Sequence, residues 1–298
     1  ADLGAGRLIE FVESVQPPIP REEKWVLIIS TLQGCPVGCA ICDAGQFYHG
    51  RLSEDELWAQ LDYLVKSRYP DSKVPAGKFK IQFARMGEPA FNPAVLAVLQ
   101  QLPKRYNAPG LLPSLSTVAP AGVNSFFDQL LEVKQELYHQ GDFQLQFSLH
   151  STDQEYRDKL IPVKKWNFTD IAGYGERFHQ KGDRKITLNF VLTNTTPIDS
   201  DILLNHFDPT IYLVKLTPLN PTYRSLEHEL ESAIDPHNES TGSPITNELK
   251  KAGYEVILSI GEPEENLIGS NCGQYIQAHL RRETALPDGY SYPVNKVE

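Results

Sequence analysis

The chain has 298 residues, of which 41% are hydrophobic and 10% aromatic, as is ordinary for a globular protein. Its formal charge is −10, from 28 Lys and Arg against 38 Asp and Glu, and an acidic surface repels phosphate backbones unless a basic patch overrides it. No apolar run is long enough to span a bilayer, and the first residues lack the apolar region of a signal peptide. We therefore disfavour a nucleic-acid partner, expect no membrane partner and predict a cytoplasmic, reducing location.

Strand and helix patterns alternate along the chain. Apolar, β-branched runs predict buried strands, and the helix after the first strand begins with the capping box of Ser53 and Glu56. The strands are expected at 24–31, 78–85, 113–118, 143–150, 184–192, 211–219 and 254–261. Helices are expected at 53–69, 92–102, 122–141, 200–207 and 242–253, with further helical stretches up to about residue 181.

This alternation predicts parallel βα units in one sheet. No repeat, low-complexity tract or linker divides the chain. We expect an N-terminal extension at 1–23, a barrel at 24–278 and a C-terminal tail at 279–298. The polar stretch at 222–244 is the least regular part of the barrel, and we interpret it as a lid or an insertion.

Three of the four cysteines lie in "GCPVGCAICDAG", at Cys35, Cys39 and Cys42. They are too close together for ordinary disulfide pairing, and zinc usually takes four ligands in repeated C-x2-C pairs. Three thiolates on one loop can hold three irons of a [4Fe–4S] cluster and leave the fourth iron open to a small-molecule chelate. Gly34 and Gly38 lack a Cβ, so the backbone can wrap closely around such a group. A zinc loop or a coincidence is the less favoured alternative.

Polar residues follow the predicted strands, where α/β folds build their active sites. Each of them alone has a structural alternative, such as a capping serine, a turn asparagine or a buried core histidine. Their shared position after successive strands is what indicates a site. The residues are Gly87, Glu88, Ser116, His150 and Asn220.

The motifs "GCPVGCAICDAG", "RMGEPAFN", "LSTVAP", "FSLHS", "LTPLNP" and "NCGQY" occur in this order. In this respect the chain resembles the radical-SAM adenine methyltransferases of ribosomal and transfer RNA and their antibiotic-resistance relatives. The resemblance covers roughly residues 19 to 278. It implies an α/β fold, a partial (βα)6 TIM-like barrel, and two cofactors, a [4Fe–4S] cluster and S-adenosylmethionine.

The resemblance also implies roles for the motif residues. The cluster ligands would be Cys35, Cys39 and Cys42. The methionyl amine of S-adenosylmethionine would meet Gly87 and Glu88, and the rest of that cofactor would contact Ser116, His150 and Asn220. An electron from a donor such as flavodoxin or ferredoxin would split the cofactor to a 5′-deoxyadenosyl radical, with the protein positioning the cofactor and excluding quenchers.

The fourth cysteine, Cys272, matches a cysteine that carries a methyl group in the resembled family. There the thiol first accepts a methyl from S-adenosylmethionine, the adenosyl radical then takes a hydrogen from that methyl, and the carbon radical adds to adenine. Gly273 and Gln274 repeat the family's C-G-Q motif here. The structural alternative for Cys272 is a small buried apolar residue.

Two features depart from the resembled family. An ungapped alignment places Ile28 where the family has a second cysteine, which helps to release the product through a disulfide, and isoleucine can neither act as a base nor form a disulfide. The family also carries an N-terminal RNA-binding region, whereas about 23 residues precede the first strand here. We therefore expect methyl or methylene transfer onto a small or nucleotide-like substrate, and RNA methylation is the disfavoured variant.

Two other functions stay open from the sequence. One is a radical-SAM hydrogen abstraction or rearrangement of a small molecule without methyl transfer. The other is a non-catalytic iron–sulfur protein, which we place lowest because the cofactor motifs are intact. The sequence names neither the substrate nor the oligomeric state.

Overall fold

The computed structural model describes residues 1–4, 7–15, 18–282 and 284–291. Of the predicted C-terminal tail, residues 283 and 292–298 therefore lie outside the described residues. The chain forms two compact units. Unit 1 consists of Ala1–Cys35, Tyr48–Phe147 and Lys164–Ile186, and unit 2 consists of Pro36–Phe47, Ser148–Val163 and the chain from Thr187 onward.

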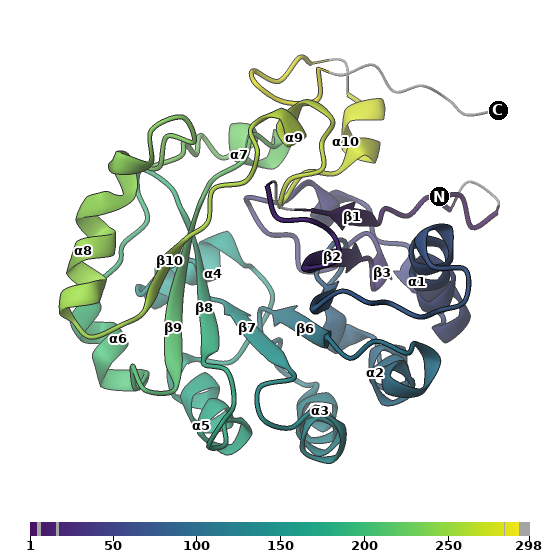
Figure 1. The fold of residues 1–298 in the computed structure, drawn as a ribbon. Coiled ribbons are helices and arrows are strands. Elements are labelled where there is room, and N and C mark those ends of the chain that lie inside the picture. Colours follow the sequence, from purple (N-terminus) through teal and green to yellow (C-terminus); the bar gives the residue numbers. More distant parts are fainter. Residues whose placement is uncertain (5–6, 16–17, 283, 292–298) are drawn as a thin grey trace. The chain divides into compact units, whose positions relative to one another are not determined.

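Unit 1 is built on a sheet with the strand order β1-β2-β5-β6-β7, drawn in purple to teal in Figure 1. β1 pairs antiparallel with β2, and the following pairs β2–β5, β5–β6 and β6–β7 are parallel. The bounds are β1 Val12–Ser14, β2 Lys24–Ile29, β5 Lys78–Phe83, β6 Leu111–Thr117 and β7 Gln144–Ser148, whose last residue lies in unit 2. A separate antiparallel pair joins β3 Leu32–Gln33 to β4 Gly50–Arg51.

The helices of unit 1 follow its strands and bury one face each. α1 packs against α2, and α2 against α3. An aromatic group of buried Phe127, buried Tyr174 and half-buried Trp166 holds α5 to α3, with ring centroids 4.3 to 5.4 Å apart. The bounds are α1 Glu54–Arg68, η2 Pro89–Phe91, α2 Ala94–Arg105, α3 Asn124–Leu137 and α5 Phe168–Phe178.

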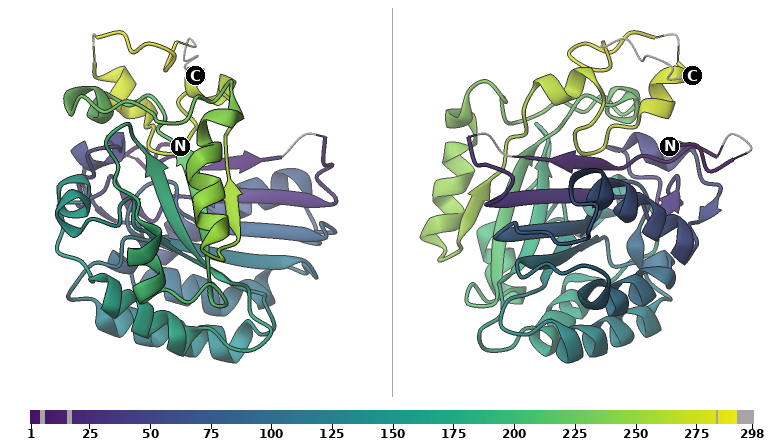
Figure 2. Two further views of the ribbon diagram at one scale, coloured as in Figure 1. Left: turned by 90° about the vertical axis from the view of Figure 1, so that its left-hand side faces the viewer. Right: turned by 45° about the vertical axis from the view of Figure 1, so that its right-hand side comes forward.

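Unit 2 carries the strands β8 Ile186–Leu192, whose first residue belongs to unit 1, β9 Tyr212–Pro218 and β10 Val256–Leu258. β10 pairs parallel with β9, and Figure 2 shows α8 lying alongside β10. The helical segments are η1 Asp43–Gln46, α4 Gln154–Leu160, α6 Ser200–His206, α7 Tyr223–Glu227, η3 Glu239–Gly242, α8 Ser243–Lys251, α9 Glu264–Leu267 and α10 Ile276–Leu280.

Every strand predicted from the sequence is present, most of them shorter by one to three residues. The short strands β1, β3 and β4 were not predicted from the sequence, and β1 adds an antiparallel edge strand to a sheet that was expected to be parallel. The predicted lid or insertion at 222–244 contains α7 and η3. Within the described residues, no helix is both long enough and apolar enough to cross a membrane.

The predicted capping box at the start of α1 is confirmed. Ser53 accepts a hydrogen bond from the Glu56 amide at 3.2 Å, and Glu56 accepts one from the Ser53 amide at 2.8 Å. Replacing Ser53 with Ala removes one of these bonds, and we expect the free energy of unfolding to fall by about 1 kcal/mol. Chemical denaturation measures this directly. The control is Ser67→Ala near the carboxyl end of the same helix, which should change stability by less than half as much.

Candidate functional site

The loop that carries Cys39 and Cys42 is a compact turn in unit 2. The Cys42 amide donates to the Cys39 carbonyl at 3.3 Å, and the Ala40 amide donates to the Leu160 carbonyl at 2.9 Å. The three clustered cysteines are half-buried. Cys35, the first of them, ends the first segment of unit 1.

Glycines set the shape of this loop. Gly38 has a φ of +71°, and a Cβ on Gly45 would lie 2.7 Å from the Gly38 Cα, so the loop closes on itself more tightly than other residues allow. A donor set of three thiols on a loop without Cβ atoms at the turns fits three irons of a cluster. The described residues hold no set of three His, Cys, Asp or Glu side chains gathered for one metal ion. A four-iron cluster spaces its cysteines more widely than a single ion does.

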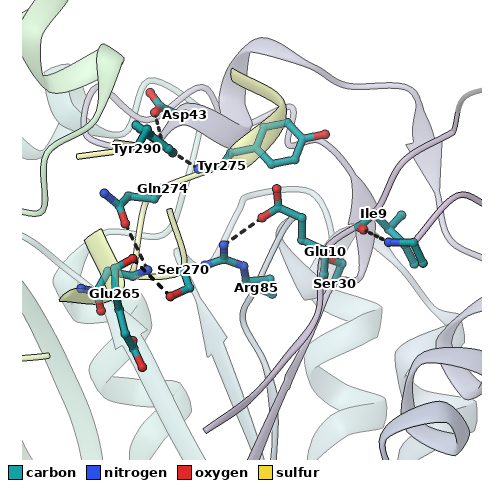
Figure 3. A network of polar contacts seen from close by, with 12 residues as sticks. Ile9, Glu10, Ser30, Asp43, Arg85, Glu265, Ser270, Gln274, Tyr275 and Tyr290 are labelled. Carbon is teal, nitrogen blue, oxygen red and sulfur yellow. Dashed lines mark hydrogen bonds and ion pairs between the residues drawn. The ribbon is translucent and has the colours of Figure 1, made fainter. Parts of the chain in front are cut away.

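The residue after the third cysteine, Asp43, is fully buried. Its carboxylate accepts hydrogen bonds from the hydroxyl of Tyr290 at 2.6 Å and from the amides of Tyr223 at 3.2 Å and Arg224 at 3.0 Å. Tyr290 in turn accepts from the Tyr275 amide at 2.8 Å, and Figure 3 shows Asp43, Tyr290 and Tyr275 together. Burial raises the pKa of Asp43, and the hydrogen bond from Tyr290 opposes that rise.

The loop of Cys272 is fastened to the cysteine loop through backbone contacts. The Asp43 amide donates to the Gly273 carbonyl at 2.8 Å. Gly273 has a φ of +85°, and a Cβ there would lie 2.7 Å from the carbonyl oxygen of Ile41. Gly273 is therefore glycine because the two loops touch at this point. The side chain of Gln274 fixes the position of the same loop, because its amide donates to the carbonyls of Pro221 at 3.0 Å and Asn266 at 3.3 Å.

Cys272 itself is exposed and carries a free thiol. The sequence-based alternative, a small buried apolar residue, is therefore wrong. The side chain of Asn220 donates to the Cys272 carbonyl at 3.0 Å. The structure thus brings Asn220, predicted as a cofactor contact, to the backbone of the cysteine that was predicted to carry the methyl group.

His150 is buried at the end of β7, with a φ of +60°. Its Nδ1 accepts from the Val191 amide at 3.1 Å, which leaves the proton on Nε2 as a donor. Burial and, to a smaller extent, the nearby charge of Arg157 together lower the pKa of His150 to about 4. His150 is therefore a neutral imidazole at physiological pH.

In unit 1, three hydrogen-bond donors surround the carboxylate of Glu88. This carboxylate accepts from the Thr117 hydroxyl at 2.5 Å, the Val118 amide at 2.9 Å and the Ala90 amide at 3.0 Å. Burial raises the pKa of Glu88 to about 7, against these three hydrogen bonds, which lower it. Two carboxylate oxygens offer about four acceptor positions, so one position stays open to a further donor such as an amine.

The residues around Glu88 explain its position. A Cβ on Gly87 would lie 2.5 Å from the Leu32 Cβ, so close packing against β3 already requires this glycine. Arg85 forms an ion pair with Glu10 at 2.8 Å, also drawn in Figure 3. Ser116 is half-buried on β6 beside Thr117, opposite Gln146 of β7.

Ile28 lies on β2, between Val12 of β1 and Gln82 of β5. It is half-buried, whereas its neighbours Leu27 and Ile29 are fully buried on the other face of the strand.

The roles of Asp43, Thr117 and Tyr290 were not predicted from the sequence. The sequence did contain an indication for Asp43. A carboxylate directly after a thiolate ligand adds negative charge, so hydrogen-bond donors are needed around it. Thr117 was seen only as the end of a strand. Tyr290 gave no signal, since its partner is distant in sequence by 247 residues.

No family model matches the chain. A Thermus thermophilus protein named "Probable dual-specificity RNA methyltransferase RlmN" is 26% identical over 283 residues, which is 91% of this chain and 73% of that protein. A protein of the same name from Pseudothermotoga lettingae is 28% identical over 78% of this chain and 67% of its own length.

Solved structures confirm the fold. A radical SAM methyltransferase from Sphaerobacter thermophilus superposes with a TM-score of 0.68 at 20% identity, covering 90% of this chain and 74% of that chain. Streptococcus suis SuiB bound to S-adenosylmethionine superposes with a TM-score of 0.53 at 13% identity, over 80% of this chain and 50% of that chain. The predicted class, an α/β fold of the radical-SAM TIM-like barrel type, is confirmed.

The comparisons also confirm the resemblance drawn from the motifs. The chain is a divergent relative of the radical-SAM methyltransferases, and thus an enzyme similar to them. The predicted cofactors, a [4Fe–4S] cluster and S-adenosylmethionine, agree with these comparisons, because SuiB was solved with S-adenosylmethionine bound.

The buried imidazole generates a pH prediction. The pKa of His150 is about 4 in the fold, whereas it is about 6.5 when unfolded. The unfolded chain therefore binds the proton first, and stability is lost as pH falls from about 6.5 towards 4. Between pH 7 and 5 this single group should cost about 2 kcal/mol.

Glu88 works in the opposite direction, because its raised pKa gives stability that is lost as pH rises towards 7. The test is therefore a comparison with His150→Asn, whose amide oxygen can replace Nδ1 as acceptor and whose backbone tolerates positive φ. The stability difference between wild type and variant should shrink by about 2 kcal/mol from pH 7 to pH 5. A difference that stays constant across this range would show that His150 does not stay neutral in the fold.

Proposed function

We propose that this enzyme transfers a methyl or methylene group through Cys272 onto a small or nucleotide-like substrate. The observation that carries the proposal is the exposed thiol of Cys272 on a loop that is hydrogen-bonded to the cysteine loop. A thiol that only filled the core would be buried. A thiol that carries a group between cofactor and substrate has to be exposed and held in place.

The cofactor residues follow from the resemblance and from the chemistry of each group. Cys35, Cys39 and Cys42 would hold the cluster, which supplies the electron that splits S-adenosylmethionine. Glu88 offers an open acceptor position to the methionyl amine, and a bound cation there would favour the ionised carboxylate. His150 offers Nε2–H as a donor, and burial keeps this donor neutral beside a sulfonium.

Cys272 accepts the methyl group by displacement. Its sulfur forms a bond to the methyl carbon as the bond from that carbon to the sulfonium breaks, S-adenosylhomocysteine leaves, and the thiol proton passes to solvent. Asn220 and Asp43 hold the loop by its backbone, through the carbonyls of Cys272 and Gly273. The reactive sulfur thereby stays free while the loop around it is fixed.

The class of acceptor is inferred from the features in which this chain departs from its relatives. The relatives are named as RNA methyltransferases, but this chain is acidic and has Ile28 at the aligned position of their product-releasing cysteine. A smaller acceptor fits these departures better. A low-potential reductant of the flavodoxin or ferredoxin kind is required, and the reducing cytoplasm suits a cluster with an open iron.

Mass spectrometry of the anaerobically reconstituted protein tests the role of Cys272. After incubation with S-adenosylmethionine, we expect one added methyl group on the peptide that contains Cys272. The variant Cys272→Ala should gain none, yet it should keep the iron–sulfur absorbance and still form 5′-deoxyadenosine when reduced.

If Cys272 stays unmodified in protein that still forms 5′-deoxyadenosine, the methyl-transfer proposal is wrong, and hydrogen abstraction or rearrangement is favoured. Formation of neither product would favour a non-catalytic iron–sulfur protein. As a matched control, Ser270→Ala on the same loop should leave the methylation of Cys272 intact.

The role of Glu88 is tested by equilibrium binding of S-adenosylmethionine to the reconstituted protein. Glu88→Gln removes the negative charge and one acceptor, so we expect affinity to fall by about 10- to 100-fold, the size of a hydrogen bond to a charged group. The cluster absorbance should not change. Glu22→Gln, an exposed residue of the same unit, is the charge-matched control, and equal affinities for the two variants would remove Glu88 from the cofactor site.

A further inference from the structure

A cavity of 790 Å³ lies in unit 2, beside the segment that follows β9. Its walls come from three stretches of this unit, residues 218–237, 263–267 and 286–288. This volume lies within the range of small-molecule sites in proteins. The first stretch includes most of the polar segment that the sequence indicated as a lid or insertion.

The wall of this cavity is apolar and acidic. Leucines and prolines make up half of the lining residues, and the three stretches also contribute four carboxylates. The leucines are Leu219, Leu226, Leu230, Leu267 and Leu286, and the acids are Glu231, Asp235, Glu264 and Asp288. Among the described lining residues there is neither Lys nor Arg, and none of the four acids forms an ion pair with a described cation.

A buried amide adds a polar group to the wall. Asn266 lines the cavity with only 7% of its surface exposed. Its Oδ1 accepts from Asn271 at 3.0 Å, and among the described residues no partner is found for its Nδ2. This Nδ2 group is therefore a hydrogen-bond donor that the wall can offer to a ligand.

The cavity is joined to the loop of Cys272. Asn220 lines the cavity and donates to the Cys272 carbonyl at 3.0 Å. Pro221 also lines it, and its carbonyl accepts from Gln274 at 3.0 Å. A molecule seated in the cavity therefore rests on the same residues that hold the proposed methyl carrier.

We propose that this cavity binds a small molecule with a cationic amine on an apolar body, as the substrate of the enzyme. The leucines and prolines cover the apolar body, and the four uncompensated carboxylates attract the amine while repelling phosphate groups. The assignment of this molecule as substrate rests on the proposed function, whereas its binding does not. The same charges disfavour RNA in the cavity.

Three probe molecules of similar shape separate the effect of ligand charge on binding from the effect of ligand size. Phenethylamine is cationic, 2-phenylethanol is neutral and 3-phenylpropionate is anionic. Their binding to the full, cluster-loaded chain is followed by ligand-observed NMR titration at low ionic strength, about 10 mM salt, because salt screens exposed charges. We expect phenethylamine to bind at least about tenfold more tightly than 3-phenylpropionate, with 2-phenylethanol between them.

Variants place the binding in the cavity. In Asp235→Asn/Glu264→Gln, we expect phenethylamine to bind about fivefold more weakly, since each exposed charge pair contributes modestly. The matched control, Asp201→Asn/Glu248→Gln, removes two exposed carboxylates of the same unit that lie outside the cavity, and it should leave phenethylamine affinity unchanged. 2-Phenylethanol affinity should stay unchanged in both.

Three results would overturn the proposal. They are equal binding of the amine and the carboxylate, an amine preference that the control variant weakens as much as the cavity variant, and a short single-stranded RNA that displaces phenethylamine. Methylation of Cys272 needs none of these probes. A protein that methylates Cys272 but fails the binding test would keep the proposed function and lose only this substrate class.

Discussion

The buried carboxyl group of Asp43 is the constraint on which the arrangement around Cys272 depends. Removing a carboxyl group from water is costly unless donors compensate it, and here a tyrosine hydroxyl and two amides of α7 do so. These donors come from two segments, the start of α7 and the chain at Tyr290, which are distant in sequence from each other and from Asp43. Once they are collected around Asp43, the backbone of the same residue meets Gly273, and the loop of Cys272 is set against the cysteine loop.

Aromatic packing reinforces this arrangement. Tyr290 stacks between Tyr223 and His279, with centroid separations of 5.5 and 5.3 Å and nearly parallel rings. The stack orients the Tyr290 hydroxyl toward Asp43, so that the hydrogen bond does not depend on a freely rotating side chain. Rigid support beneath an exposed thiol is what a group carrier needs, because the sulfur has to meet two different partners in turn.

The strands and the main motifs could be predicted from the sequence because their signals are local. The spacing of apolar residues, the content of β-branched residues and the capping box at Ser53 can each be recognised within a few residues of sequence. The cysteine spacing is likewise a motif of only eight residues. β1 was not predicted because a strand of three residues is too short to show an alternating pattern of apolar and polar residues. The partners of Asp43 and Glu88 were missed because they lie far along the chain, and packing rather than pattern brings Tyr290 and Thr117 to them. Exposure of Cys272 is likewise a property of the folded loop alone.

The carboxylates of the cavity bear on why this chain departs from its relatives. An enzyme that acts on RNA has to neutralise phosphates, and its contacts are made by Lys and Arg. Here the cavity that Asn220 and Pro221 connect to the loop of Cys272 is lined by four acids and, among the described residues that line it, by no such cation. A polyanion would be repelled by this cavity. The net charge of −10 and the acids of this cavity therefore both favour the proposed acceptor, a small molecule rather than a nucleic acid.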